Sequence, residues 1–175
     1  DFSRTSTVET LRTKVTDTLQ TYANSLEINK FGGRFRYSKI QQIIDNTNTA
    51  ITSNITKVRI RRDLKAVINQ FAQYELCYGN QFHVKSGGFN IKSTGFRIAT
   101  DPDVVYLTDI PNPDGKTGIL SIVKPITSES TRVVVKSAGT IDYIKGEINI
   151  STIKITSTER ANNIIEIQAF PESND

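Results

Sequence analysis

The sequence predicts an α+β fold, in which an N-terminal unit of two helices and a strand precedes a mainly antiparallel, β-rich region. Three observations lead to this prediction. Apolar residues recur at steps of three and four over the first 30 positions, they alternate with polar residues from about residue 57 onward, and turn signals separate the later apolar runs. We place the boundary at residue 68, with a helical unit over 1–68 and a β-rich region over 69–175.

The first helix has a start signal and a continuous apolar stripe. Ser6 and Glu9 have the spacing of a capping box, which predicts a helix start at this point. We expect the helix to end near Asn29, because its apolar residues follow one another on a single face: Val8, Leu11, Val15, Leu19, Tyr22 and Leu26. The stripe fits core packing within the chain or contact with another chain, and on the second interpretation Leu11, Val15, Leu19 and Tyr22 are interface residues.

The second helix follows a glycine pair that permits a sharp reversal of the chain. Gly32 and Gly33 can adopt positive φ at low cost. Ser38 and Gln41 then form another capping box, so we expect a helix from Ser38 to about residue 45. The two helices form an αα unit, and the alternation of Val58 and Ile60 with basic residues predicts a strand after it.

Short strands and turns account for the rest of the chain. Alternation predicts a strand over 71–78, with turns at 79–80, 111–115 and 145–146. Further strands are expected over 96–98, 104–108, 118–123, 132–136, 147–156 and 163–170. We expect a β-meander.

The predicted strand 147–156 changes parity in its middle. Ser151 and Thr152 stand together between two pairs of isoleucines, so Ile153 and Ile155 do not share the parity of the first pair. A one-residue shift sends side chains to the opposite face unless a bulge absorbs it. The sequence therefore predicts either a bulge at this point or a strand whose Ile153 and Ile155 face a partner chain.

Composition excludes several classes of protein. The chain of 175 residues has 22 Lys and Arg, 18 Asp and Glu, a net charge of +4 and 23% charged residues, which excludes charge-driven disorder. It has no apolar run near the roughly 18 residues of a membrane helix and no signal-peptide pattern, so we expect a soluble protein. Because it begins with Asp1 and contains no Met, we expect a piece of a longer polypeptide.

The chain offers little material for catalysis or metal binding. Cys77 and His83 are the single cysteine and the single histidine, too few for a disulfide framework or a common zinc site. They could form a nucleophile pair across the turn at 79–80, but a small cysteine in an alternating strand is more typical of packing. We expect no catalytic residue, no cofactor and no metal ion.

Two further patterns do not meet the requirements of a binding site. The sequence Asp114-Gly115-Lys116-Thr117 ends like a phosphate-binding P-loop, but Ile110 stands where that motif needs its first glycine. Asp101, Asp103 and Asp109 lack the spacing of a calcium loop, so we interpret them as part of a solvated turn.

The densest charge lies between Lys57 and Lys65. Arg59, Arg61 and Arg62 also belong to this run, which could neutralise nucleic-acid phosphates. It has no interleaved aromatic residues, and the net charge is modest for a DNA-binding protein. We favour pairing with water or with protein carboxylates, which makes Arg59 and Arg61 candidate interface residues, and keep a nucleic-acid-binding module as the alternative.

Several segments in a fixed order carry a family resemblance. They are the runs FGGRFRYSKI at 31–40, IIDN at 43–46, ITSN at 51–54, YELCYGN at 74–80, NIKSTGF at 90–96 and the last fourteen residues, 162–175. Together they resemble baseplate J-like proteins, in particular the wedge subunit of T-even-type contractile-tailed bacteriophages. The resemblance covers most of the chain.

The resemblance implies a structural role and no enzymatic one. It implies a component of the phage tail baseplate wedge that joins neighbouring subunits into a ring, which rearranges during sheath contraction. The implied partners are other copies of the chain, as a homodimer, and other wedge proteins, with no nucleic acid, membrane or small-molecule substrate. The implied location is the tail baseplate of the virion, after assembly in the bacterial cytoplasm.

Overall fold

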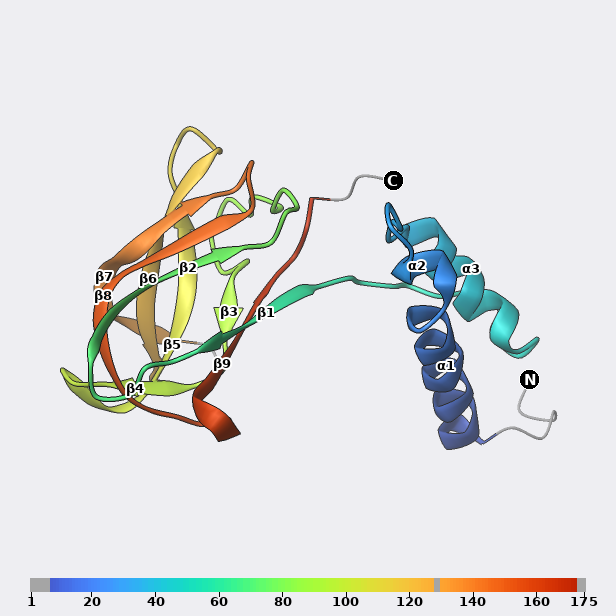
Figure 1. Cartoon of the computed structure of the whole chain (residues 1–175), viewed down its shortest axis with the longest axis horizontal. Helices are drawn as coiled ribbons and strands as arrows, with labels where there is room; N and C mark the ends of the chain where they lie inside the picture. Colours follow the sequence, from blue (N-terminus) through green and yellow to red (C-terminus); the bar gives the residue numbers. More distant parts are fainter. Residues whose placement is uncertain (1–6, 128–129, 173–175) are drawn as a thin grey trace. The chain divides into compact units, whose positions relative to one another are not determined.

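The computed structural model describes residues 7–127 and 130–172, which fall into two compact units (Figure 1). The first, the helical unit, extends to Val58, and the second, the strand unit, covers Arg59–Glu172. The division therefore lies ten positions before the expected residue 68, because the first strand pairs with the last strand of the second unit. Helices precede an antiparallel, strand-rich region as predicted, but the protein is mostly β with some helix.

The helical unit contains three helices: α1 (Val8–Ala23), α2 (Leu26–Asn29) and α3 (Tyr37–Thr47). Helices α1 and α3 pack against each other. The segment after α3 returns along it, where the Tyr37 hydroxyl donates to the carbonyl of Thr56 and the Asn54 amide donates to Asp45. These bonds hold the chain against α3 up to the start of the strand unit.

Helix α1 is shorter than the sequence predicts. The expected helix to Asn29 is wrong, because α1 ends at Ala23 and α2 is a separate turn of helix. At the break Asn24 is the C-cap of α1, and the Ser25 hydroxyl donates to the carbonyl of Tyr22 at 2.7 Å. Ser6 of the expected capping box lies outside the described residues, and Thr7 caps the helix by accepting from the Thr10 amide.

Helix α3 begins without the capping box expected at Ser38. It starts one residue earlier, at Tyr37, with Arg36 at the N-cap and no side-chain hydrogen bond to the first turn. It ends at Thr47, close to the predicted end.

Among the described residues, nine strands pair in an antiparallel sheet: β1 (Ile60–Lys65), β2 (Phe71–Cys77), β3 (Lys92–Ser93), β4 (Phe96–Ile98), β5 (Asp101–Pro111), β6 (Thr117–Pro125), β7 (Thr131–Asp142), β8 (Glu147–Thr158) and β9 (Ile164–Ala169). The predicted strand 96–98 is confirmed, and β5 and β7 are longer than predicted. No pattern in the sequence predicts β3, which has two residues.

The pairings close on themselves. Strand β5 pairs with β6, β6 with β7, β7 with β8, β8 with β4 and β4 with β5, so these strands form a small barrel. Strand β3 connects β9 and β1 to this circuit, and β2 lies along β8 (Figure 1). Closure leaves fewer unpaired sheet edges.

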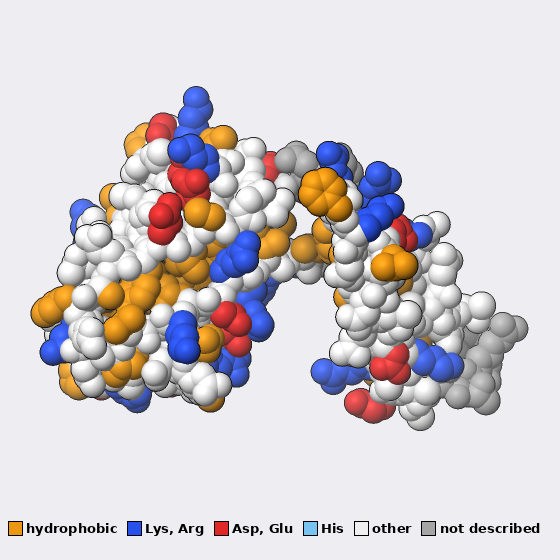
Figure 2. Space-filling model, in the orientation of Figure 1, with side chains coloured by type: hydrophobic (Ala, Val, Ile, Leu, Met, Phe, Trp, Pro, Cys, Tyr) orange, Lys and Arg blue, Asp and Glu red, His pale blue; other side chains and the backbone are white. Residues whose placement is uncertain are grey.

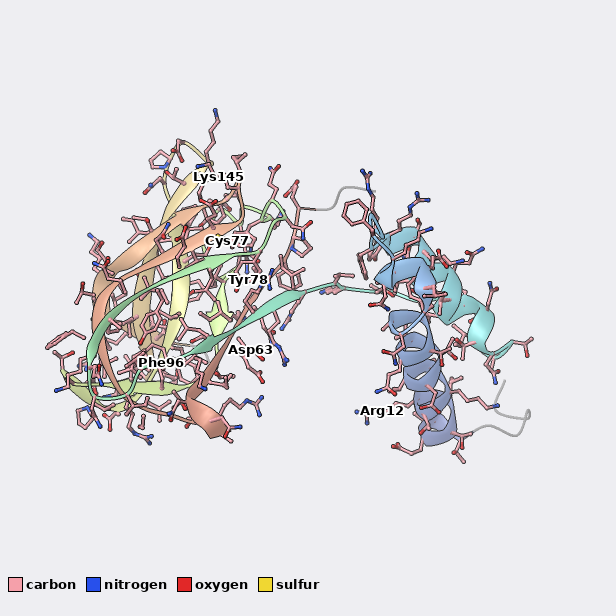
Figure 3. All side chains as sticks on the ribbon, viewed as in Figure 1. Arg12, Asp63, Cys77, Tyr78, Phe96 and Lys145 are labelled. Atoms are coloured by element: carbon pink, nitrogen blue, oxygen red, sulfur yellow. The ribbon has the colours of Figure 1, made fainter. Side chains whose placement is uncertain are left out.

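The alternation in the sequence places the core inside this barrel. In β2, Leu76 is buried and Tyr74 half-buried, whereas Gln73 and Glu75 between them are exposed, as predicted. Figure 3 shows Tyr78 and Phe96 within the strand unit. The largest fully buried side chains all come from this unit and include Tyr143, Phe82, Phe96, Ile91, Leu120 and Ile122.

Candidate interaction surfaces

The apolar stripe of α1 is only partly covered. Leu11, Val15, Leu19 and Tyr22 are half-buried, and α3 is the element that packs on this helix. No described residue of the helical unit, 7–58, is fully buried. The stripe therefore serves packing between the helices and still exposes apolar area that another chain could cover.

A second exposed surface in the helical unit combines aromatic and basic side chains. We call residues 30–36 the basic–aromatic loop; its charged and aromatic members are Lys30, Phe31, Arg34, Phe35 and Arg36. All five are exposed, and Phe31 has a relative exposure of 108%. Figure 2 shows hydrophobic and basic side chains gathered on the helical unit. The glycine pair predicts only a chain reversal in this segment, although the alternation of Phe and Arg without a carboxylate is a readable signal of a surface for contacts.

The basic run at β1 makes its contacts within the chain. Arg61 lies 3.1 Å from Asp63 and 3.3 Å from Glu166, which also pairs with Arg160. The Arg59 guanidinium lies 4.7 Å from the centre of the Phe170 ring. Both arginines therefore help to hold β1 beside β9, and the carboxylates that face Arg61 belong to its own strand unit.

The expected irregularity in β8 is a bulge. Ala72 pairs with Ile153 and Tyr74 with Ile150, so two steps on β2 match three on β8, and the extra residue falls at Ser151–Thr152. This confirms the first of the two alternatives. Ile155 is only 2% exposed and Ile153 packs against the same core, so the bulge turns both inward and leaves Ile155 no surface for a partner.

Cys77 and His83 have different neighbours. The sulfur of Cys77, labelled in Figure 3, lies 3.9 Å from the Glu75 carboxylate on the exposed side of β2. His83 Nδ1 lies 3.1 Å from Glu172. Among the described residues no group of three His, Cys, Asp or Glu side chains could hold a metal ion. The contacts of these residues thus support no nucleophile pair.

The Asp114-Gly115-Lys116-Thr117 sequence forms the turn between β5 and β6. The Asp114 carboxylate accepts from the amides of Lys116 and Thr117 and from the Thr117 hydroxyl, and these bonds hold the pKa of Asp114 below its usual value. Gly115 has φ 62°, which this tight turn requires. The segment is a hairpin turn and not a phosphate loop.

The three aspartates interpreted as a solvated turn are not one. Asp101 and Asp109 of β5 are both buried. Asp103 is exposed and forms an ion pair with Lys124 of β6, and its hydrogen bond with this lysine lowers the pKa of Asp103. The residues therefore serve structural contacts of the barrel.

An open hollow of about 410 Å³ lies on the outer face of β2, β7 and β8, beside the bulge. Its lining residues are Gln73, Tyr74, Glu75, Thr140, Asn149, Ile150 and Ser151. Glu75, Asn149 and Thr140 are cross-strand neighbours, so the hollow is the polar face of the sheet itself.

No helix in the described ranges is long and apolar enough to cross a membrane.

These features define a class of protein: a small barrel joined to a helical unit with exposed apolar and basic surfaces. One comparison with known families gives a match. Residues 3–63 match the model described as baseplate structural protein gp6, C-terminal domain III. This segment covers the helical unit and reaches into β1. No curated protein matches the chain.

The match supports a structural protein of a phage baseplate, located in the virion tail and with partners among baseplate proteins. The match does not support the more specific expectation from the sequence, membership of the baseplate J-like family.

Proposed function

We propose that this chain is a structural component of a phage tail baseplate wedge, which joins neighbouring subunits into a ring that rearranges during sheath contraction. Kinship with baseplate J-like proteins is part of this proposal. So are self-association as a homodimer, contact with other wedge proteins, assembly in the bacterial cytoplasm and the absence of enzymatic activity.

The observation that carries the proposal is the uncovered helical unit. It matches a baseplate structural domain over residues 3–63, and its described residues include none that is fully buried. A unit with so little core gains most of its stability from contacts with other chains. Val8 and Leu26, at the two ends of the predicted apolar stripe, are 74% and 84% exposed and would become buried on assembly.

The strand unit is suited to act as a rigid body, which complements the exposed helical unit. Its core is closed by the barrel, and Arg59 and Arg61 are engaged with Phe170, Asp63 and Glu166. A ring that changes diameter needs rigid bodies that move as units, together with contacts that persist. We infer that the barrel is such a body and that the helical unit provides the contacts.

The test is localisation in the assembled particle. Antibodies against the strand unit, used with gold labels on purified virions of the phage that encodes this chain, should mark the baseplate at the end of the tail. Label on the capsid, on the sheath or on no part of the particle would refute the proposal.

A further inference from the structure

We propose that the basic–aromatic loop, residues 30–36, docks into an apolar groove rimmed by carboxylates on another protein. This inference rests on the function proposed above, since it names the chemistry of one partner surface in the assembly.

The two phenylalanines of the loop are exposed without cover. Phe31 has a relative exposure of 108% and Phe35 of 55%, whereas Tyr37 and Ile40 of α3 are half-buried. Aromatic side chains contribute more than other residue types to protein interfaces, because they bury a large area with few rotatable bonds. The two phenylalanines lie within five positions of each other, and the helical unit does not bury either ring.

Backbone constraints fix the shape of the loop. Gly32 has φ +75°, and a Cβ on Gly33 would lie 2.1 Å from the carbonyl oxygen of Ile28. The Gly33 amide donates to the Lys30 carbonyl at 2.8 Å, and the Asn29 side chain ties α2 to the carbonyl of Ala23 at 2.6 Å. Glycine suits both positions, and the hydrogen bonds tie the start of the loop to α1 and α2, which reduces the ordering cost of binding.

The charge of the loop has one sign. Residues 28–44 contain no Asp or Glu, whereas Lys30, Arg34, Arg36 and Lys39 are basic. None of these four forms an ion pair within the part of the chain that the structure describes. The electrostatic complement of such a surface is a row of carboxylates around the pocket that receives the rings.

Apolar exposure favours a protein over a nucleic acid as the partner. Leu26, in α2 just before the loop, is 84% exposed. Phosphates can neutralise the arginines and bases can stack on the phenylalanines, but a nucleic acid gives little cover to aliphatic side chains. A protein groove satisfies the rings, Leu26 and the charges together.

The test uses the whole chain and three labelled probes in fluorescence anisotropy. The first probe is a helical peptide with leucine on one face and glutamate on the other, the second has serine in place of leucine, and the third is oligo-dT of similar length. We expect the first probe to bind at least about tenfold more tightly than the other two. We expect Phe31→Ser and Arg34→Glu each to weaken this binding by at least about tenfold.

Phe71→Ser is the matched control. Phe71 is 73% exposed and lies 5.9 Å from the Lys154 ammonium, but it belongs to the strand unit and has no basic loop around it. This variant should bind the first probe like the unchanged chain. Circular dichroism of the three variants, whose substituted side chains are exposed, checks that they remain folded.

Several results would overturn the inference: no binding of the first probe, equal binding of the leucine and serine peptides, or equal losses in Phe31→Ser and Phe71→Ser. Tighter binding of oligo-dT that Phe31→Ser abolishes would assign the loop to nucleic acid instead. The peptide experiment needs no virion, so its outcome is separate from that of the gold labelling. A labelled baseplate together with a failed peptide test would reject the loop and keep the proposed function.

Discussion

Asp109 shows how one residue attaches a loop to the barrel. Its carboxyl group is fully buried, accepts from the Tyr143 hydroxyl at 2.8 Å and accepts from the Ile91 amide at 2.7 Å. The first bond joins β5 to the turn after β7, and the second fixes the segment that leads into β3. If the Tyr143 hydroxyl is removed, the buried Asp109 oxygen loses its donor but remains away from water. The loss of this one hydrogen bond should therefore lower the stability of the strand unit.

Tyr143→Phe should therefore destabilise the strand unit by about 2 kcal/mol. Urea unfolding followed by circular dichroism at pH 7 measures this change. Tyr106→Phe is the control, because the Tyr106 hydroxyl makes no hydrogen bond in the described structure, and it should cost less than about 0.5 kcal/mol. Equal effects of the two substitutions would show that the Asp109 contact contributes nothing.

The buried tyrosines predict a loss of stability at alkaline pH. Burial is the main cause that raises the pKa of both Tyr78 and Tyr143 above the ordinary value of 10.0. Below pH 10 both tyrosines are protonated in the folded and in the unfolded chain, so their contribution to the free energy of unfolding is complete. Above it the unfolded chain ionises first, so the free energy of unfolding should fall by about 1.4 kcal/mol per pH unit for each tyrosine.

Urea midpoints between pH 9 and pH 11.5 measure this slope. Tyr78→Phe removes one of the two groups and should make the slope clearly shallower. An unchanged slope in this variant would contradict the assignment of the pH dependence to Tyr78.

At the scale of single elements, β8 separates what the sequence could predict from what it could not. The parity change at Ser151 and Thr152 was readable, and the bulge is there. The choice between a bulge and a partner-facing strand required the pairing with β2, which joins residues about 75 positions apart. The same holds for barrel closure and for β3, because local patterns indicate strands and not their neighbours.

Deleting Thr152 should leave the strand unit folded. The deletion removes the extra residue and restores two steps on β8 for two on β2, so Ile153 and Ile155 still point inward. We expect a change in the free energy of unfolding within about 1 kcal/mol, measured by urea unfolding. Deleting Asn149 is the matched control and should abolish folding, because it reverses Ile148 relative to Ile150 in the regular part of the strand. Unfolding of both deletion variants would show that the bulge itself is required.

In the helical unit, the apolar pattern predicted the type of element but not its end. The apolar spacing predicted a helix correctly, but it did not reveal the break between Ala23 and Leu26. The predicted interface residues also lie in environments that the sequence pattern did not distinguish. Leu11, Val15, Leu19 and Tyr22 lie on a partly exposed helix, whereas Ile155 lies in the core, and only tertiary packing distinguishes the two environments.

At the scale of the whole molecule, the two units should differ in resistance to proteolysis. No described residue of the helical unit is fully buried, whereas the strand unit has a buried core and a hydrogen-bonded barrel. Brief digestion of the free chain with trypsin should cut within residues 12–59 and leave a stable fragment that begins near β1. Mass spectrometry identifies the fragment, and equal rates of cleavage in both units would contradict this division.

Hydrogen exchange of α1 and α3 in the free chain and in purified tails tests most directly whether the helical unit is completed by assembly. In the free chain these amides should exchange quickly, because no described residue of the helical unit is fully buried. In tails they should slow by at least about 100-fold, while the amides of β5 and β6 change little. Equal exchange of α1 and α3 in both states would contradict the account, since the helical unit would then have gained no partner in the baseplate.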